Sequence, residues 1–259
     1  MSPLLIDTHC HFDAAEFDHD RDAEYARAVA GGVTTQIIPA ITRDNFAAVA
    51  AVCERYPGCV PAWGMHPMLI AVHRPEHLAD LRAQIDRQRP AAIGEIGLDL
   101  FIRGLDFATQ EYFYVEQLKI AKEYDLPVLL HSRKSADQLL KQLRRIRVRG
   151  GIAHAFNGSP QQAQEFIKLG FKLGFGGAFT WPRANNLRRL AVSLPLEAIV
   201  LETDSPDIPP VWIGRGRNAP GELPRIAQTL AELRGISIEL VSDSTSRNAR
   251  EVLSLGANP

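Results

Sequence analysis

The sequence predicts an α/β protein built as a single (β/α)8 TIM barrel, with residues 1–259 as one domain. Its length of 259 residues is usual for such a barrel. Short runs rich in Val, Ile and Leu, typical of buried parallel strands, alternate with helix-like runs eight times. An open, doubly wound sheet is the main alternative. It needs a Gly-rich turn after the first strand, where residues 8–13 read THCHFD.

Each expected strand precedes an expected helix, and a further helix ends the chain. The expected strands cover residues 4–9, 34–40, 59–67, 91–99, 126–132, 150–156, 171–179 and 198–206. The expected helices cover residues 21–32, 43–57, 75–89, 106–125, 135–147, 159–170, 183–194, 224–235 and 237–256. Ser159 and Pro160 suit the N-cap and first position of one helix. The loop 204–224 is long and rich in Pro and Gly, which is typical of a functional loop.

Charge and cysteine content limit the binding partners and the cellular compartment that we expect. A formal net charge of −1 gives no general field that would attract nucleic acid. Cys10, Cys53 and Cys59 form no C-x-x-C pair, so we expect a reducing compartment. Neither a signal peptide nor a membrane-spanning run is recognisable. We therefore expect a cytoplasmic monomer with no membrane association and no obligate protein partner.

Side chains that bind metals recur at one structural place, the end of an apolar run just before a loop. They are His9, His11, Glu95, His131, His154 and Asp204. In a barrel, the carboxyl ends of the strands converge on one mouth. Six ligands are too many for one tetrahedral ion that keeps a water, so we expect two divalent ions. Mixed nitrogen and oxygen ligands suit Zn²⁺, Mn²⁺ or another first-row ion, with Mg²⁺ bound more weakly.

The positions of these residues predict their roles. His9 and His11 are separated by one residue and share a strand face, while Cys10 points to the other. Glu95 can bridge two ions with its two oxygens and is an expected catalytic residue. Asp204 is the other: it can bind an ion and accept a proton from water that the metal activates. Glu202 is expected to hold a histidine or a backbone amide.

Six motifs then occur in order along almost the whole chain. They are DTHCHF (7–12), GMHP (64–67), GEIGLD (94–99), PVLLHSR (127–133), HAFNGS (154–159) and ETDSP (202–206). Together they resemble the TatD family of metal-dependent deoxyribonucleases, among the amidohydrolase-type barrels. The resemblance implies that one ion is held by His9, His11, Glu95 and Asp204, and the other by Glu95, His131 and His154. It also implies hydrolysis of phosphodiester bonds at the 3′ ends of single-stranded DNA.

The sequence departs from the family pattern at two places. Leu100 and Phe101 follow GLD, where family members often carry aromatic residues. Residues 215–220 read RGRNAP, with Ala in place of the Glu of the family's R-G-x-x-N-E-P loop. Neither change touches an expected metal ligand, so both bear on substrate choice.

Several groups near the mouth are expected to contact a substrate phosphate. They are His66, Arg133, Arg215 and Arg217, together with the helix start at Ser159. The expected partner is a DNA end or a small phosphoester. An alternative is a hydrolase of a small amide, lactone or phosphoester, and a further one is a binding protein without catalysis. Many relatives in that broader class bridge their metals with a carboxylated Lys; residues 91–99 contain Glu95 and no Lys, which favours the TatD-like site.

Overall fold

Eight parallel strands form the centre of the molecule in the computed structural model, which describes residues 4–256. The strands are β1 Leu5–Asp7, β2 Val33–Pro39, β3 Cys59–Trp63, β4 Ala92–Asp99, β5 Val128–Arg133, β6 Gly151–Ala153, β7 Phe171–Phe175 and β8 Ile199–Leu201. They pair in sequence order. Backbone hydrogen bonds join the first and last: Thr8 N–H donates to Leu201 O (3.1 Å) and Asp204 N–H donates to His9 O (2.8 Å). The predicted (β/α)8 barrel is confirmed.

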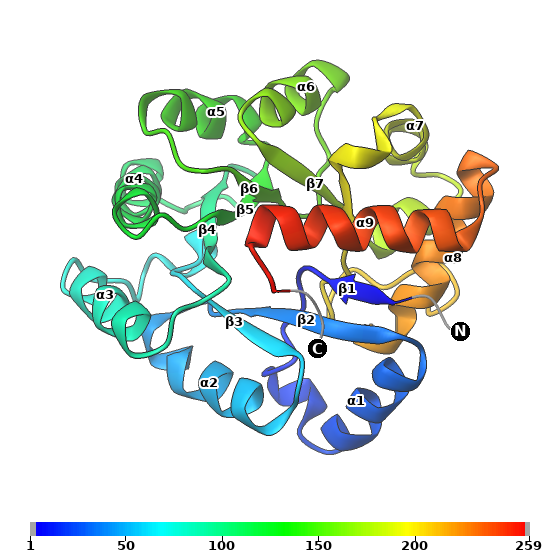
Figure 1. The fold of residues 1–259 in the computed structure, drawn as a ribbon. Helices are drawn as coiled ribbons and strands as arrows, with labels where there is room; N and C mark the ends of the chain where they lie inside the picture. Colours follow the sequence, from blue (N-terminus) through cyan, green and yellow to red (C-terminus); the bar gives the residue numbers. More distant parts are fainter. Residues whose placement is uncertain (1–3, 257–259) are drawn as a thin grey trace.

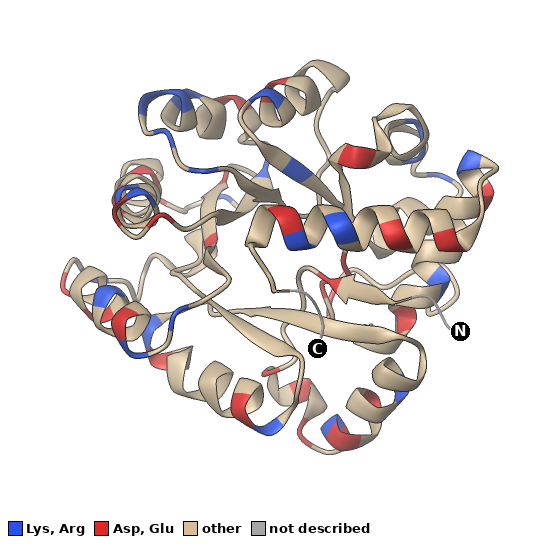
Figure 2. Ribbon diagram, viewed as in Figure 1, with Lys and Arg blue, Asp and Glu red and all other residues tan. Residues whose placement is uncertain are grey.

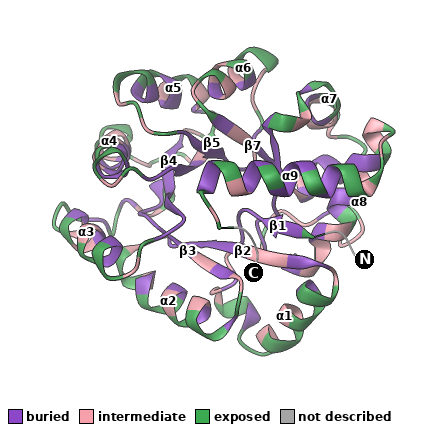
Figure 3. Ribbon diagram, viewed as in Figure 1, coloured by how far each residue is buried: buried purple, intermediate pink, exposed green. Residues whose placement is uncertain are grey.

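The helices surround these strands. They are α1 Arg21–Ala30, α2 Phe46–Arg55, α3 His77–Arg87, α4 Phe107–Glu123, α5 Ala136–Arg145, α6 Pro160–Lys168, α7 Asn185–Ser193, α8 Leu223–Arg234 and α9 Ile238–Leu253. Figure 1 shows α1–α8 as a ring outside the strands, with α9 lying across the barrel. The faces of the ring helices that point away from the strands are exposed, whereas the strands are buried (Figure 3).

Several strands are shorter than the sequence predicts. β1 ends at Asp7, β6 at Ala153 and β8 at Leu201. His9, His154 and Asp204 therefore follow these strands rather than end them. Backbone bonds to neighbouring segments continue past these ends, from His154 N–H to Leu130 O (3.1 Å) and from Asp204 N–H to His9 O (2.8 Å), and side-chain contacts add to them.

One end of the barrel is closed by α9. A buried apolar cluster joins inward-facing strand residues to Ala249, Val252 and Leu253 of that helix; the strand residues include Ile6, Ile37, Leu129, Ile152 and Val200. Ser246 of α9 donates to Leu4 O (2.9 Å), just before β1, and Asn248 donates to Ile199 O (2.7 Å), at the start of β8, so α9 covers the amino-terminal end of the barrel. The carboxyl ends of the strands form the opposite, open mouth.

Charge is spread over the outer helices rather than gathered on one side. Lys and Arg alternate with Asp and Glu around the ring in Figure 2. Many of them pair locally, as Arg82 does with Glu123 (2.9 Å) and Arg144 with Glu165 (2.8 Å). Within residues 4–256, the helices include none that is long and apolar enough to cross a membrane.

Candidate metal centre

Glu95 lies at the centre of a buried cluster of imidazoles at the mouth. Its Oε1 is 2.9 Å from His131 Nδ1 and 3.6 Å from His154 Nε2. Its Oε2 is 3.1 Å from His9 Nε2 and 3.7 Å from His11 Nε2. Both oxygens of one carboxylate thus face different histidines, which is the arrangement that a bridging ligand requires.

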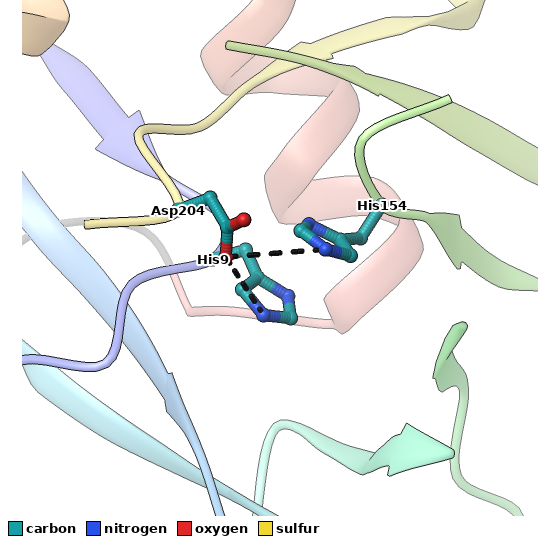
Figure 4. A group of neighbouring side chains, drawn as sticks. All are labelled: His9, His154 and Asp204. Atoms are coloured by element: carbon teal, nitrogen blue, oxygen red, sulfur yellow. Dashed lines mark ion pairs between the residues drawn. The ribbon is translucent and has the colours of Figure 1, made fainter. Parts of the chain in front are cut away.

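Asp204 closes the other side of the cluster. Its Oδ1 lies 3.7 Å from His9 Nε2 and 3.9 Å from His154 Nε2, and the three side chains point towards one another (Figure 4). The rings of His9 and His154 are stacked, with centroids 3.7 Å apart. His11 Nε2 is 3.8 Å from the same carboxylate oxygen. All six residues predicted as metal ligands are therefore brought together.

His66 was expected to contact a substrate phosphate, but it lies within the donor cluster itself. Its Nε2 is 3.2 Å from Glu95 Oε1 and 3.2 Å from His131 Nδ1, and donor atoms of these three residues lie within 4.8 Å of one another. The same spacing holds for His9, His11 and Glu95, and for His9, His154 and Asp204. The GMHP motif placed His66 at the mouth, but its contact with Glu95 depends on how β3 aligns with β4.

Two further carboxylates stand behind the histidines. Asp99 Oδ2 is 3.1 Å from His131 Nε2, on the ring edge away from Glu95. Glu202 Oε1 is 3.2 Å from His154 Nδ1 and accepts a hydrogen bond from Ala155 N–H (2.6 Å). Glu202 thus contacts both a histidine and a backbone amide, as the sequence predicted. Such carboxylates fix which ring nitrogen is free and how the ring is turned.

The approach of Glu202 depends on a glycine. A Cβ atom at Gly174 in β7 would lie 2.2 Å from Glu202 Oε2. No side chain fits there without moving the carboxylate away from His154. The sequence shows Gly174 only as one of several glycines, so its role was not predictable.

The segment that carries Asp204 is held by a buried network. The Asp7 carboxylate accepts from Thr203 N–H (2.9 Å) and Thr203 Oγ1–H (2.6 Å). Buried Asn218 donates to Thr203 O (2.8 Å) and Asp207 O (2.9 Å). Asp204 itself has φ of 57°, in the left-handed region that non-glycine residues rarely adopt. The network holds this unusual backbone and so aims the carboxylate at the cluster.

The electrostatics of the cluster favour a cation. Burial opposes charge on Glu95, but the surrounding His66, His9 and His154 outweigh it and hold its pKa well below the usual range. Burial likewise opposes a proton on His154, yet Asp204 and Glu202 reverse this and raise its pKa to about 10. Burial raises the pKa of Asp204 to about 6. The field that keeps a proton on a buried imidazole also attracts a metal ion.

The donor set fits divalent metal ions. It combines imidazole nitrogens with carboxylate oxygens, a mixture that suits Zn²⁺, Mn²⁺ and related first-row ions. The donors are nearly all buried, and their contacts are with one another rather than with distant counter-ions. The donors form three overlapping groups: His9 belongs to two of them and Glu95 to two. These are His/Glu metal-binding clusters of the kind that the sequence predicted.

The residues predicted to hold phosphate are placed differently from one another. Arg133 is half-exposed at the mouth, 4.0 Å from Asp99 Oδ2. Arg215 is exposed on the loop after β8. Arg217 is instead paired with Asp20 through two hydrogen bonds (2.8 and 2.6 Å) and lies over Phe17. This Arg217 contact ties the last loop to the start of α1.

Ser159 is engaged in starting α6. Its Oγ accepts from Gln162 N–H (3.1 Å), and its own N–H donates to Gln162 Oε1 (2.9 Å), which is a capping box. A phosphate at this position would have to compete with both bonds. The S-x-x-Q spacing in the sequence was a visible signal for this contact.

Comparison with known proteins agrees with the site. The profile of the family described as TatD related DNase matches residues 6–254. An uncharacterized metal-dependent hydrolase, YjjV of Escherichia coli K12, is 45% identical over 234 residues, covering 89% of this chain and 90% of its own. The crystal structure of the E. coli YjjV protein superposes with a TM-score of 0.95 at 40% identity, covering 99% and 100% of the two chains. A 3′-5′ ssDNA/RNA exonuclease TatD of Cronobacter sakazakii is 33% identical, covering 98% of this chain and 100% of its own. The chain therefore belongs to the TatD family of metal-dependent hydrolases.

Proposed function

We propose that this chain hydrolyses phosphodiester bonds at the 3′ end of single-stranded DNA. The observation that carries the proposal is the central carboxylate of Glu95, which has imidazole nitrogens against both of its oxygens. The full-length similarity to a 3′-5′ ssDNA/RNA exonuclease supports a nucleic acid strand as substrate. A mouth of this kind accepts a strand end more readily than the side of a duplex.

Under this proposal the donors divide around Glu95. His9, His11 and Asp204 lie on its Oε2 side, and His131 lies on its Oε1 side with His66 and His154. Divalent ions held there would lower the pKa of water and offset the negative charge of the phosphodiester. We expect two ions at this site, with Glu95 as the ligand that they share.

The protein's own groups then handle the proton. Asp204 accepts it from the attacking water as the new bond to phosphorus forms; a phosphorus–oxygen ester bond breaks, and the departing oxygen takes a proton from solvent and leaves as a hydroxyl. Its carboxylate is suited to this because it is held by the backbone of a braced segment and faces the histidines of the cluster. Glu202 and Asp99 keep His154 and His131 oriented while this happens.

The test compares substrates on one preparation. Protein stripped with chelator and reloaded with Mn²⁺, Zn²⁺ or Mg²⁺ is incubated with 5′-labelled single-stranded DNA, blunt duplex, bis(p-nitrophenyl) phosphate, and a panel of amides and lactones. We expect stepwise shortening of the single strand from its 3′ end, dependent on metal. Hydrolysis of an amide or lactone without cleavage of any phosphodiester would overturn the proposal in favour of a small-molecule hydrolase.

Asp204→Asn should lower kcat by about 10²–10⁴-fold, the usual contribution of a general base. Asp207→Asn is the matched control because Asp207 is an exposed carboxylate three residues further along the same loop. If Asp204→Asn keeps a normal kcat, Asp204 is not the group that accepts the proton.

A further inference from the structure

An open aromatic surface stands at the rim of the same mouth. Phe101 follows β4, and its side chain is 50% exposed. The guanidinium carbon of Arg133 lies 4.0 Å from the centre of the Phe101 ring, and the ammonium of Lys134 lies 4.9 Å from it. Arg133 and Lys134 are themselves exposed. A flat aromatic group, a flat cation and a second positive charge thus share one solvent-facing place.

This surface is fixed to the metal centre through Asp99. One oxygen of its carboxylate accepts from Phe101 N–H (2.8 Å) and Ile102 N–H (3.0 Å). The other faces His131 Nε2 at 3.1 Å and Arg133 Nη1 at 4.0 Å. The backbone adds a bond from Leu100 N–H to Arg133 O (2.9 Å). The rim therefore begins one side chain away from the cluster and is held rigidly to it.

A small hollow continues from Lys134 along the rim. Its volume is about 210 Å³, and Ser132, Lys134, Asn157 and Gly158 are among its lining residues. Pockets that hold whole drug-sized ligands measure about 300–1,000 Å³, so this hollow has room for only a part of one. A sugar or phosphate group of a longer substrate is of that scale.

We propose that Phe101 and Arg133, with Lys134 beside them, form a subsite that stacks the base and holds the phosphate of the nucleotide next to the one being cleaved. The inference rests on the proposed nuclease function and names the part of the strand that is gripped. Bases stack on aromatic rings and on guanidinium planes, and such stacking tolerates any base sequence. A metal-binding cluster alone recognises only the phosphate, so this surface would distinguish a nucleic acid strand from a simple phosphodiester.

Binding to two matched oligonucleotides tests the stacking. Fluorescence anisotropy would compare 5′-labelled pentathymidylate with the same strand lacking the base of the penultimate 3′ nucleotide. The Asp204→Asn protein loaded with Mn²⁺ is used, so that the strands stay intact. The complete strand should bind about 5- to 150-fold more tightly, the range expected for one stacked base. When Phe101→Ala is combined with Asp204→Asn, the difference in affinity between the two strands should disappear. Phe101→Trp in the same background should keep it.

The matched control is Tyr112→Ala, which removes another exposed aromatic side chain, one that lies on α4. It should leave the preference for the complete strand unchanged. If the two strands bind equally well before any change at Phe101, or if Phe101→Ala keeps the preference, no base stacks there and the inference is wrong.

Salt dependence separates the two partners of the subsite. Arg133→Ala should reduce the slope of log K against log salt by about 0.7, the contribution of one phosphate on a single strand, whereas Phe101→Ala should leave the slope unchanged. Arg133→Lys should restore the slope, because lysine carries the same charge. Cleavage by the wild-type protein distinguishes the two proposals. If the wild-type protein shortens DNA but the substitutions leave binding unchanged, only the subsite is refuted. If the wild-type protein neither cleaves nor binds DNA, both proposals are refuted.

Discussion

Replacing the central carboxylate gives the sharpest test of the metal centre. Glu95→Gln keeps the size of the side chain but removes its charge and one of its two acceptors. Glu95 belongs to two of the three donor groups, with His9 and His11 and with His66 and His131. Because a bridging residue serves both positions, its loss should lower metal occupancy at each of them rather than at one.

The effect has a calculable size in a melting experiment. A ligand at 100 times its Kd stabilises the folded state by about 2.7 kcal/mol. For a chain of this length, 1 kcal/mol corresponds to roughly 2–4 °C in Tm, so each occupied position should add about 5–11 °C. The wild-type protein should lose this increment when it is stripped with chelator, and Glu95→Gln should show little difference between stripped and reloaded samples.

Elemental analysis and differential scanning calorimetry on the same samples measure both quantities. Glu123→Gln serves as the control, since Glu123 is exposed and pairs with Arg82 on the outer helices. If Glu95→Gln retains the wild-type metal content and the full rise in Tm, the carboxylate is not a bridge and the donor groups act independently.

Other substitutions test the scaffold. Gly97→Ala should lower the free energy of unfolding, measured by urea denaturation, by at least about 3 kcal/mol, because φ is 146° and a Cβ would meet His131 O at 2.1 Å. Gly104→Ala is the control: its φ is 87° but the space around it is open, so the loss should be smaller. Asn218→Ala should cost at least about 2 kcal/mol by the same assay, since buried carbonyl groups lose their donor, and a change within about 0.5 kcal/mol would contradict this. Burial raises the pKa of Cys59 to about 12, so this thiol should react with a disulfide reagent at pH 8 only on unfolding. Because the pKa of Cys59 in the folded protein exceeds the unfolded value of about 8.5, its contribution to the free energy of unfolding is complete below about pH 8.5 and is lost as pH rises towards 12. The fall in the free energy of unfolding at alkaline pH should therefore be smaller in Cys59→Ala.

The barrel and the place of its site were predictable because they depend on local patterns. Apolar runs of strand length and the helical runs between them fix the order of elements whatever the tertiary contacts are. The spacing of His9 and His11 fixes a shared face, and their Nε2 atoms indeed lie within 3.4 Å of each other while Cys10 packs in the core. A strand-end position therefore predicts that a side chain reaches the mouth.

The partners at the mouth were less predictable because they depend on contacts between distant segments. Arg217 and Asp20 are 197 residues apart, and nothing near either residue indicates their pairing. His66 meets Glu95 only because β3 and β4 align Trp63 with Ile93. The sequence showed Asp99 as the last residue of GEIGLD, but its contact with His131 needs the register of β4 against β5, which pairs Gly97 with His131.

The buried carboxylates explain how residues beyond the short strands are placed so closely. His9, His154 and Asp204 follow the ends of β1, β6 and β8, where backbone bonds to neighbouring segments continue, such as His154 N–H to Leu130 O (3.1 Å) and Asp204 N–H to His9 O (2.8 Å). Asp7 joins the segment after β1 to Thr203 after β8, and Glu202 joins Ala155 after β6 to the same segment. Each carboxylate accepts from a backbone amide and so adds to the backbone bonds at the mouth. The backbone bonds between neighbouring strand ends and the acids behind the donors together fix the segments that carry the metal donors.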